Sequence, residues 1–154
     1  MTETKFDPTE AHKQFSAGNF NAAWELIEKT ERSPEEQEQM LLLSMASIWH
    51  WTQRPDCTPQ NLSIGYWQAS RVHAISGLPD EARRFGNLCL ENSQAQGVAP
   101  FALAYAYEAL ARAEAMAGNV TKRDEHIVEA RKVMERMTDA DMVKYLESDL
   151  ATIP

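Results

Sequence analysis

Cys57 is the residue whose type and position most favour covalent chemistry. It directly precedes Thr58-Pro59, which has the form of a helix start, and a helix N-terminus lowers the pKa of a thiol. His50 and His73 are the candidate bases for a Cys–His nucleophile. However, the spacing matches no catalytic signature, and no neighbour supplies an orienting third group or an oxyanion hole. We therefore expect a protein that is not an enzyme.

The four histidines do not form a metal-binding pattern. His12, His50, His73 and His126 lack a second histidine four residues away and an acidic residue at ligand spacing. Glycine-rich phosphate loops are absent, and the carboxylates are scattered rather than paired in apolar surroundings. The sequence predicts neither a metal ion nor a cofactor.

Trp49, His50 and Trp51 are three consecutive ring side chains. Consecutive helical residues point about 100° apart, so the three rings cannot all face one core. One interpretation is that the tryptophans pack the loop at 54–57, with Arg54 over an indole face. The alternatives are an aromatic pocket of a ligand sensor and the interface of a homodimer.

The composition is that of an ordinary globular chain. Its 154 residues, 44% hydrophobic, fit a single domain over 1–154 with a substantial core. The net charge of −8 repels phosphate backbones, so we do not expect nucleic acid as a partner. Segment 1–8 has no apolar run, and 40–49 is too short to span a bilayer. With only two cysteines, the expected location is the cytoplasm, without membrane attachment.

Prolines and glycines divide the sequence into helices. The interior prolines lie at or next to plausible helix starts, where a missing N–H costs nothing. Ser33-Pro34-Glu35-Glu36 has the form of a capping box, and no segment is typical of a strand. The pattern predicts an all-α fold of about eight helices, at 8–17, 20–32, 34–53, 59–76, 79–96, 99–117, 120–136 and 139–150. The short connections require antiparallel neighbours.

Three glycine junctions are alike and indicate an internal repeat. They are Ala17-Gly18-Asn19, Ser76-Gly77-Leu78 and Ala117-Gly118-Asn119, with Ala82 five residues after the second glycine. This pattern resembles the turn between the two helices of a tetratricopeptide repeat. The glycines are 59 and 41 residues apart (77 − 18 and 118 − 77), whereas that family repeats about every 34 residues.

The resemblance implies a short α-solenoid of antiparallel hairpins at about 8–32, 59–96 and 99–136. An extra helix at 34–53 and a C-terminal capping helix at 139–150 complete it. Small residues at close helix crossings, Ala82 and Ala111 among them, are then expected to be buried.

The resemblance also implies a binding groove. Six residues before the three glycines are His12, Arg71 and Arg112, a position that faces the concave surface in tetratricopeptide-repeat proteins. Trp67 and Glu108 lie four residues before the two arginines, on the same helical face. These five residues would line a groove that binds a peptide, acidic or held by its C-terminal carboxylate. The alternative is that the arginines are solvated, or paired with nearby acids such as Glu108.

The function expected from the sequence is therefore non-catalytic binding of a protein or peptide, as in an adaptor or a chaperone-like module. A homodimeric structural or regulatory protein is the first alternative. A ligand sensor that uses Trp49, His50 and Trp51 is the second.

Overall fold

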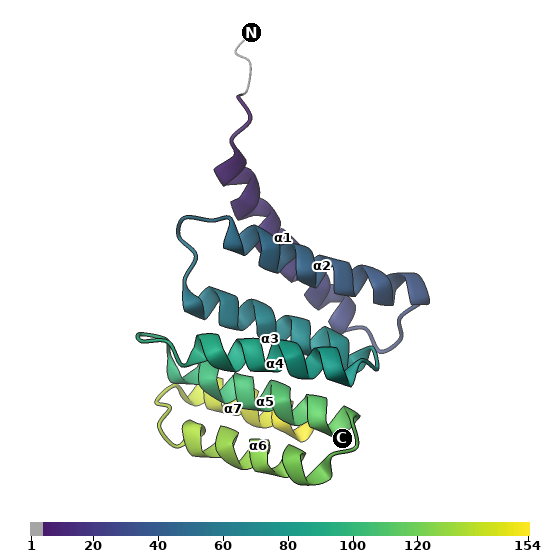
Figure 1. Cartoon of the computed structure of the whole chain (residues 1–154), viewed down its shortest axis with the longest axis vertical. Coiled ribbons are helices and arrows are strands. Elements are labelled where there is room, and N and C mark those ends of the chain that lie inside the picture. The colour runs from purple at the N-terminus through teal and green to yellow at the C-terminus, as the bar shows by residue number, and fades with distance from the viewer. Residues whose placement is uncertain (1–4) are drawn as a thin grey trace. The chain divides into compact units, whose positions relative to one another are not determined.

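The computed structural model describes residues 5–154 and consists of α-helices joined by turns (Figure 1). The seven helices of the described chain are α1 (Pro8–Ile27), α2 (Pro34–Thr52), α3 (Pro59–Ile75), α4 (Pro79–Ser93), α5 (Pro100–Met116), α6 (Val120–Met134) and α7 (Ala140–Ala151). No strand occurs between residues 5 and 154, which confirms the all-α class. None of the described helices is both long and apolar enough to cross a membrane. The sequence predicted no signal sequence in segment 1–8. Residues 1–4 of that segment lie outside the described residues.

The predicted helix starts are confirmed where proline marks them. α1 to α5 each begin on a proline, whose fixed φ and absent N–H suit the first helical position. At α2, the Ser33 hydroxyl accepts from the Glu36 N–H at 3.2 Å, and the Glu36 carboxylate accepts from the Ser33 N–H at 3.0 Å. Thr58 and Asn61 form a second reciprocal cap at the start of α3.

Gly77 and Gly118 end α3 and α5 in the same way. Both have positive φ, 75° and 80°, which glycine adopts without steric cost. The N–H after each glycine returns to a carbonyl five residues earlier, Leu78 to His73 and Asn119 to Glu114, both at 2.9 Å. This is the Schellman arrangement, in which the last free carbonyls of a helix are satisfied.

The junction at Gly18 was predicted wrongly. α1 runs without a break through Gly18, so the two helices expected at 8–17 and 20–32 are one, and no hairpin exists at 8–32. Ser16 and Ala23 lie seven residues apart, so they share the buried face of α1, and the Ser47 hydroxyl of α2 donates to the Ser16 carbonyl at 2.8 Å. A turn at Gly18 would divide this packed face, whereas a glycine inside a helix costs only about 1 kcal/mol. The helix at 34–53 is correspondingly not extra, because α2 is the partner of α1.

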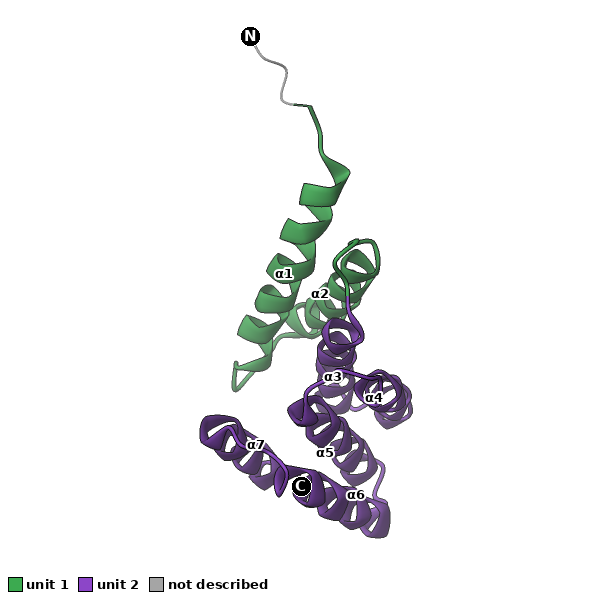
Figure 2. Ribbon diagram, turned by 90° about the vertical axis from the view of Figure 1, so that its left-hand side faces the viewer, with its two compact units in different colours: residues 1–57 green, residues 58–154 purple. Residues whose placement is uncertain are grey.

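The chain divides into two compact units, residues 1–57 and 58–154, coloured separately in Figure 2. The first unit is the α1–α2 pair, whose buried apolar side chains are Ala23, Met40 and Ile48. In the second unit α3 packs on α4, α4 on α5 and α5 on α6, and α3 and α7 also pack on α5. Within this unit, α7 and α4 lie on opposite sides of α3 and α5 (Figure 2).

The second unit repeats with a period of 41 residues (118 − 77). Tyr66 of α3 stacks on Phe85 of α4, with ring centroids 6.1 Å apart and planes at 24°. At the same positions 41 residues later, Tyr107 of α5 stacks on His126 of α6 at 6.2 Å and 26°. The hairpins α3–α4 and α5–α6 are thus structural equivalents. Ala82 and Ala111, expected at close helix crossings, are fully buried.

Candidate partner-binding groove

Glu108 of α5 is the centre of a buried polar network in the second unit. Its side chain is fully buried, which is unfavourable for a carboxylate unless donors surround it. The Trp67 indole N–H donates to one carboxylate oxygen at 2.8 Å. Arg71 donates to the other oxygen at 3.1 Å, and Arg112 donates to that same oxygen through two nitrogens, at 2.8 and 3.1 Å. The sequence-predicted groove residues of α3 and α5 are therefore brought together.

Arg112 links this network to the C-terminal helix. Its guanidinium also donates to the Asp149 carbonyl at 3.1 Å and to the Thr152 hydroxyl at 2.8 Å. The network therefore connects three helices, α3 through Trp67, α5 through Glu108 and Arg112, and α7 through its last turn. A guanidinium suits this task because its five N–H donors point in fixed directions.

Asp149 of α7 adds a second carboxylate. The Tyr105 hydroxyl donates to it at 2.9 Å, and the Arg71 guanidinium lies 3.5 Å away. Arg71, Arg112, Glu108 and Asp149 carry two charges of each sign, so the network is neutral. Burial raises the pKa of Glu108, but the two arginines outweigh it and hold that pKa below its ordinary value. Burial and the Asp149 charge raise the pKa of Tyr105, which stays a donor at neutral pH.

The arginines do not have the free head groups that the sequence analysis expected of a groove. Arg112 is only 6% exposed, and the Arg71 side chain only 11%. Both are engaged by Glu108, the alternative that the sequence analysis left open, because the helical spacing places Glu108 one turn before Arg112. A binding role for Trp67, Arg71, Glu108 and Arg112 stays a prediction. Their direct contribution in the structure is to tie α3, α5 and α7 together.

An apolar cavity lies beside this network, on the side of the unit where α7 packs. Its volume is about 210 Å³. Its large lining side chains are half-buried and come from three helices: Ile64 and Trp67 of α3, Phe101 and Tyr105 of α5, and Met142 of α7. The Trp67 and Tyr105 rings meet edge to face, with centroids 5.1 Å apart. Since Trp67 donates to Glu108 and Tyr105 to Asp149, the network fixes two walls of the cavity.

His12 does not belong to the groove, contrary to the equivalence drawn from Gly18. It lies in the second turn of α1, in the first unit, with its Nδ1 2.8 Å from Nδ1 of His50 in α2. Burial and, second, the charge of His12 lower the pKa of His50. Trp49 packs on both histidines, with centroids 5.4 Å from His12 and 4.9 Å from His50, and is 56% exposed. His12 is thus part of the predicted secondary cluster rather than of the groove.

The other residues of interest near 50–57 have packing roles. The Arg54 guanidinium lies 3.8 Å from the centroid of the Trp51 ring, as in the loop-packing interpretation. It also pairs with Asp56 at 2.7 Å. Burial raises the pKa of Cys57, so the lowered pKa expected from its place before a helix is wrong. Burial likewise raises the pKa of Cys89 to about 11, as expected for a core thiol.

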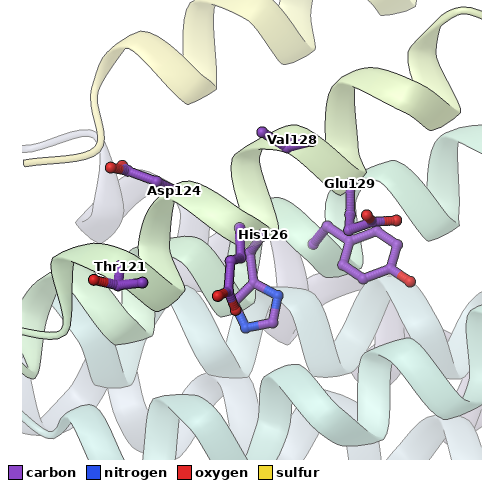
Figure 3. Close-up of a pocket in the computed structure, with 7 residues that line it drawn as sticks. Thr121, Asp124, His126, Val128 and Glu129 are labelled. Carbon is purple, nitrogen blue, oxygen red and sulfur yellow. The ribbon is translucent and has the colours of Figure 1, made fainter.

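A larger depression of about 700 Å³ surrounds α6 but does not gather its side chains (Figure 3). His126 projects from one side of the helix, while Asp124 and Val128 project from the other. His126 stacks on Tyr107, and burial lowers its pKa. Across residues 5–154, no three His, Cys, Asp or Glu side chains lie close enough to hold a metal ion.

Tyr105, Asp149 and the apolar lining of the cavity were not predicted from the sequence. The 41-residue period could have predicted Asp149, because Trp67, Glu108 and Asp149 follow one another at that interval (108 − 67 and 149 − 108). An indole donor and two acids at equivalent positions of three alternate helices, α3, α5 and α7, would meet on one face. The half-buried apolar residues gave no such signal, since a core position has the same composition.

Comparison with protein-family models, with curated proteins and with solved structures finds no match for this chain.

Proposed function

We propose that residues 58–154 form a module similar to tetratricopeptide repeats that binds another protein through the apolar cavity between α3, α5 and α7. The observation that carries the proposal is the cavity itself. Ile64, Trp67, Phe101, Tyr105 and Met142 are half-buried, and they converge on one solvent-open space. Apolar side chains gathered around an open cavity typically mark a binding site.

The size of the cavity indicates what enters it. The cavity has a volume of about 210 Å³. An apolar cavity of about 150 Å³ already holds a benzene ring. One large apolar side chain of a partner therefore fits, as an anchor residue does in a protein interface.

The polar groups around the cavity favour binding over catalysis. Glu108 is fully engaged by Trp67 and the two arginines, and the Tyr105 hydroxyl donates to Asp149. Acyl or proton transfer needs a base and a nucleophile that are both free to react, and these groups do not supply such a pair. Their rigid arrangement instead preorganises the cavity walls, which lowers the entropy cost of binding.

The proposal is tested by selecting short random peptides, displayed on phage, against the full chain. Selected peptides should share a large apolar residue, and Ile64→Glu should abolish their binding by placing a charge in the cavity wall. Val128→Glu is the matched control, since Val128 is 51% exposed and projects from α6 outside the cavity. Circular dichroism verifies that both variants stay folded. Peptide binding that survives Ile64→Glu would rule the cavity out.

The homodimer remains a second candidate, favoured by an exposed apolar row on α2. Leu42, Met45 and Trp49 share one helical face and are 62%, 41% and 56% exposed. Light scattering on Trp49→Ala distinguishes the two candidates. A drop from dimer to monomer mass supports the homodimer, with Trp51→Ala as the control because Trp51 is covered by Arg54. A monomeric parent chain excludes it.

A further inference from the structure

The apolar cavity continues into a second depression at the start of α5. That depression has a volume of about 290 Å³ and shares Phe101 and Met142 with the cavity. Its remaining lining comes from the turn before α5 and the turn between α6 and α7: Ala99, Pro100, Arg136, Met137, Thr138 and Asp139. Because Phe101 and Met142 line both spaces, the two lie side by side and form one groove, apolar at the Trp67 end and polar at the Arg136 end.

Arg136 is the unusual residue of this groove. Of the nine arginines, all within the described residues, the other eight form an ion pair with a carboxylate or donate to backbone carbonyls; they are Arg32, Arg54, Arg71, Arg83, Arg84, Arg112, Arg123 and Arg131. The Arg136 side chain is exposed, and the described chain offers its guanidinium no hydrogen bond or ion pair.

Asp139 lines the same depression but forms no ion pair with Arg136. One of its carboxylate oxygens accepts from the N–H groups of Asp141 and Met142, at 3.0 and 3.1 Å, and so caps α7. Its charge is thereby directed at the helix start, where it is stabilised. The Arg136 guanidinium is thus left to pair with an external anion, and a guanidinium favours a carboxylate because the two can form paired hydrogen bonds.

We propose that the groove binds a peptide segment of another protein in which a large apolar residue is flanked by Asp or Glu. The apolar side chain fills the cavity between Ile64, Trp67 and Tyr105, and the acidic side chain pairs with Arg136. The carboxylate belongs to a side chain rather than to a chain end, because the groove is open and lets the segment continue past Arg136. This inference rests on the proposed function, which supplies the apolar anchor.

The test uses a peptide from the random-peptide selection, synthesised with a fluorophore and measured by anisotropy against the full chain. The selected peptides should carry Asp or Glu near the apolar residue. Arg136→Glu should weaken binding by about tenfold or more, the effect of losing a charged hydrogen bond. Replacing the peptide's acidic residue with Lys should then restore binding to Arg136→Glu. Arg131→Glu is the matched control, an exposed arginine of α6 that does not line the groove.

Other outcomes overturn the inference in distinguishable ways. Peptides that depend on Ile64 but bind Arg136→Glu as tightly as the parent chain overturn the acidic pairing and leave the proposed function intact. Peptides that need a free C-terminus, and lose affinity when it is amidated, overturn the side-chain source of the carboxylate. Peptide binding that survives Ile64→Glu defeats both proposals. Self-association that Ile64→Glu abolishes would show that a second copy fills the groove, which also overturns the inference.

Discussion

Glu108 keeps its charge in a fully buried position because three side chains converge on it. Trp67, Arg71 and Arg112 donate to its two oxygens. The cost of burying an ion pair is large, so such a pair adds little net stability compared with apolar packing. Breaking it is different, because the partners then stay buried without compensation. Replacing Glu108 alone should therefore lower the stability by more than the small net contribution of the ion pair suggests.

We predict that Glu108→Gln lowers the free energy of unfolding by about 3–5 kcal/mol, the usual effect of removing one member of a buried pair. The amide has nearly the same shape, so the loss is due to the charge. Chemical denaturation followed by circular dichroism measures it. Glu91→Gln, at an exposed position of α4, should change little. Equal stability of the two variants would contradict the central role of Glu108.

His50 is one of two histidines whose pKa is lowered in the folded protein, the other being His126. Burial and the charge of His12 lower the pKa of His50 below the ordinary 6.5, because both disfavour the protonated form in the folded state. The unfolded chain binds the proton more readily, so the contribution of His50 to stability is fully present above pH 6.5 and is lost as the pH falls through the lowered folded pKa.

An NMR titration of the histidine ring protons should therefore show His50 changing below pH 6.5. His12→Ala should move that midpoint upward, since it removes the neighbouring charge and opens the site to water. The same titration in concentrated urea is the control and should give an ordinary midpoint. A folded-state midpoint above the urea value would contradict the packing of His12 on His50.

At the scale of the helices, the sequence predicted what short-range signals determine. Proline fixes the starts of α1 to α5, and Gly77 and Gly118 fix two ends, because these residues restrict or release a single backbone position. Gly18 has the same neighbours as Gly118, yet its helix continues. The difference lies in the partner, since α2 packs on α1 beside Gly18, where Ser47 donates to the Ser16 carbonyl, and no local pattern reveals that.

The candidate site, like the helices, was predictable from the sequence only in part. Helical spacing and the glycine turns correctly placed Trp67, Arg71, Glu108 and Arg112 together. Their burial was not predictable from spacing, because it depends on the docking of α7, whose Asp149 and Thr152 complete the network. Whether a polar helical face is exposed or covered depends on whether another helix packs on it.

Two helical glycines test this account directly. An added Cβ at Gly18 would meet no atom within 4 Å, whereas at Gly86 of α4 it would lie 2.8 Å from Cδ2 and 3.2 Å from Cγ of buried Leu110. Gly18→Ala should stabilise the protein by about 1 kcal/mol through helix propensity. Gly86→Ala should lower stability, because overpacking costs about 1–3 kcal/mol and exceeds the propensity gain. Melting temperatures of the two variants measure the contrast, and a destabilised Gly18→Ala would argue that α1 breaks there.

At the scale of the whole molecule, the two units differ in the core that each contains. Among the described residues, 5–57 bury three apolar side chains almost completely, Ala23, Met40 and Ile48, and the other eighteen lie in residues 58–154. An isolated helix pair depends on tertiary burial, because helix propensity alone is marginal in water. The second unit contains a polar network and an apolar core of its own. We therefore expect it to fold without the first unit.

We predict that residues 58–154, expressed alone, stay helical and unfold cooperatively, whereas residues 1–57 alone are largely unfolded. Circular dichroism and urea denaturation of the two fragments measure this, with the full chain as the reference. The groove and Arg136 lie entirely in the second unit, so the longer fragment should bind a selected peptide as tightly as the full chain does. A folded fragment with a weakened affinity would mean that the first unit contributes to binding. An unfolded fragment would mean that the buried network cannot hold α3, α5 and α7 together without α1 and α2.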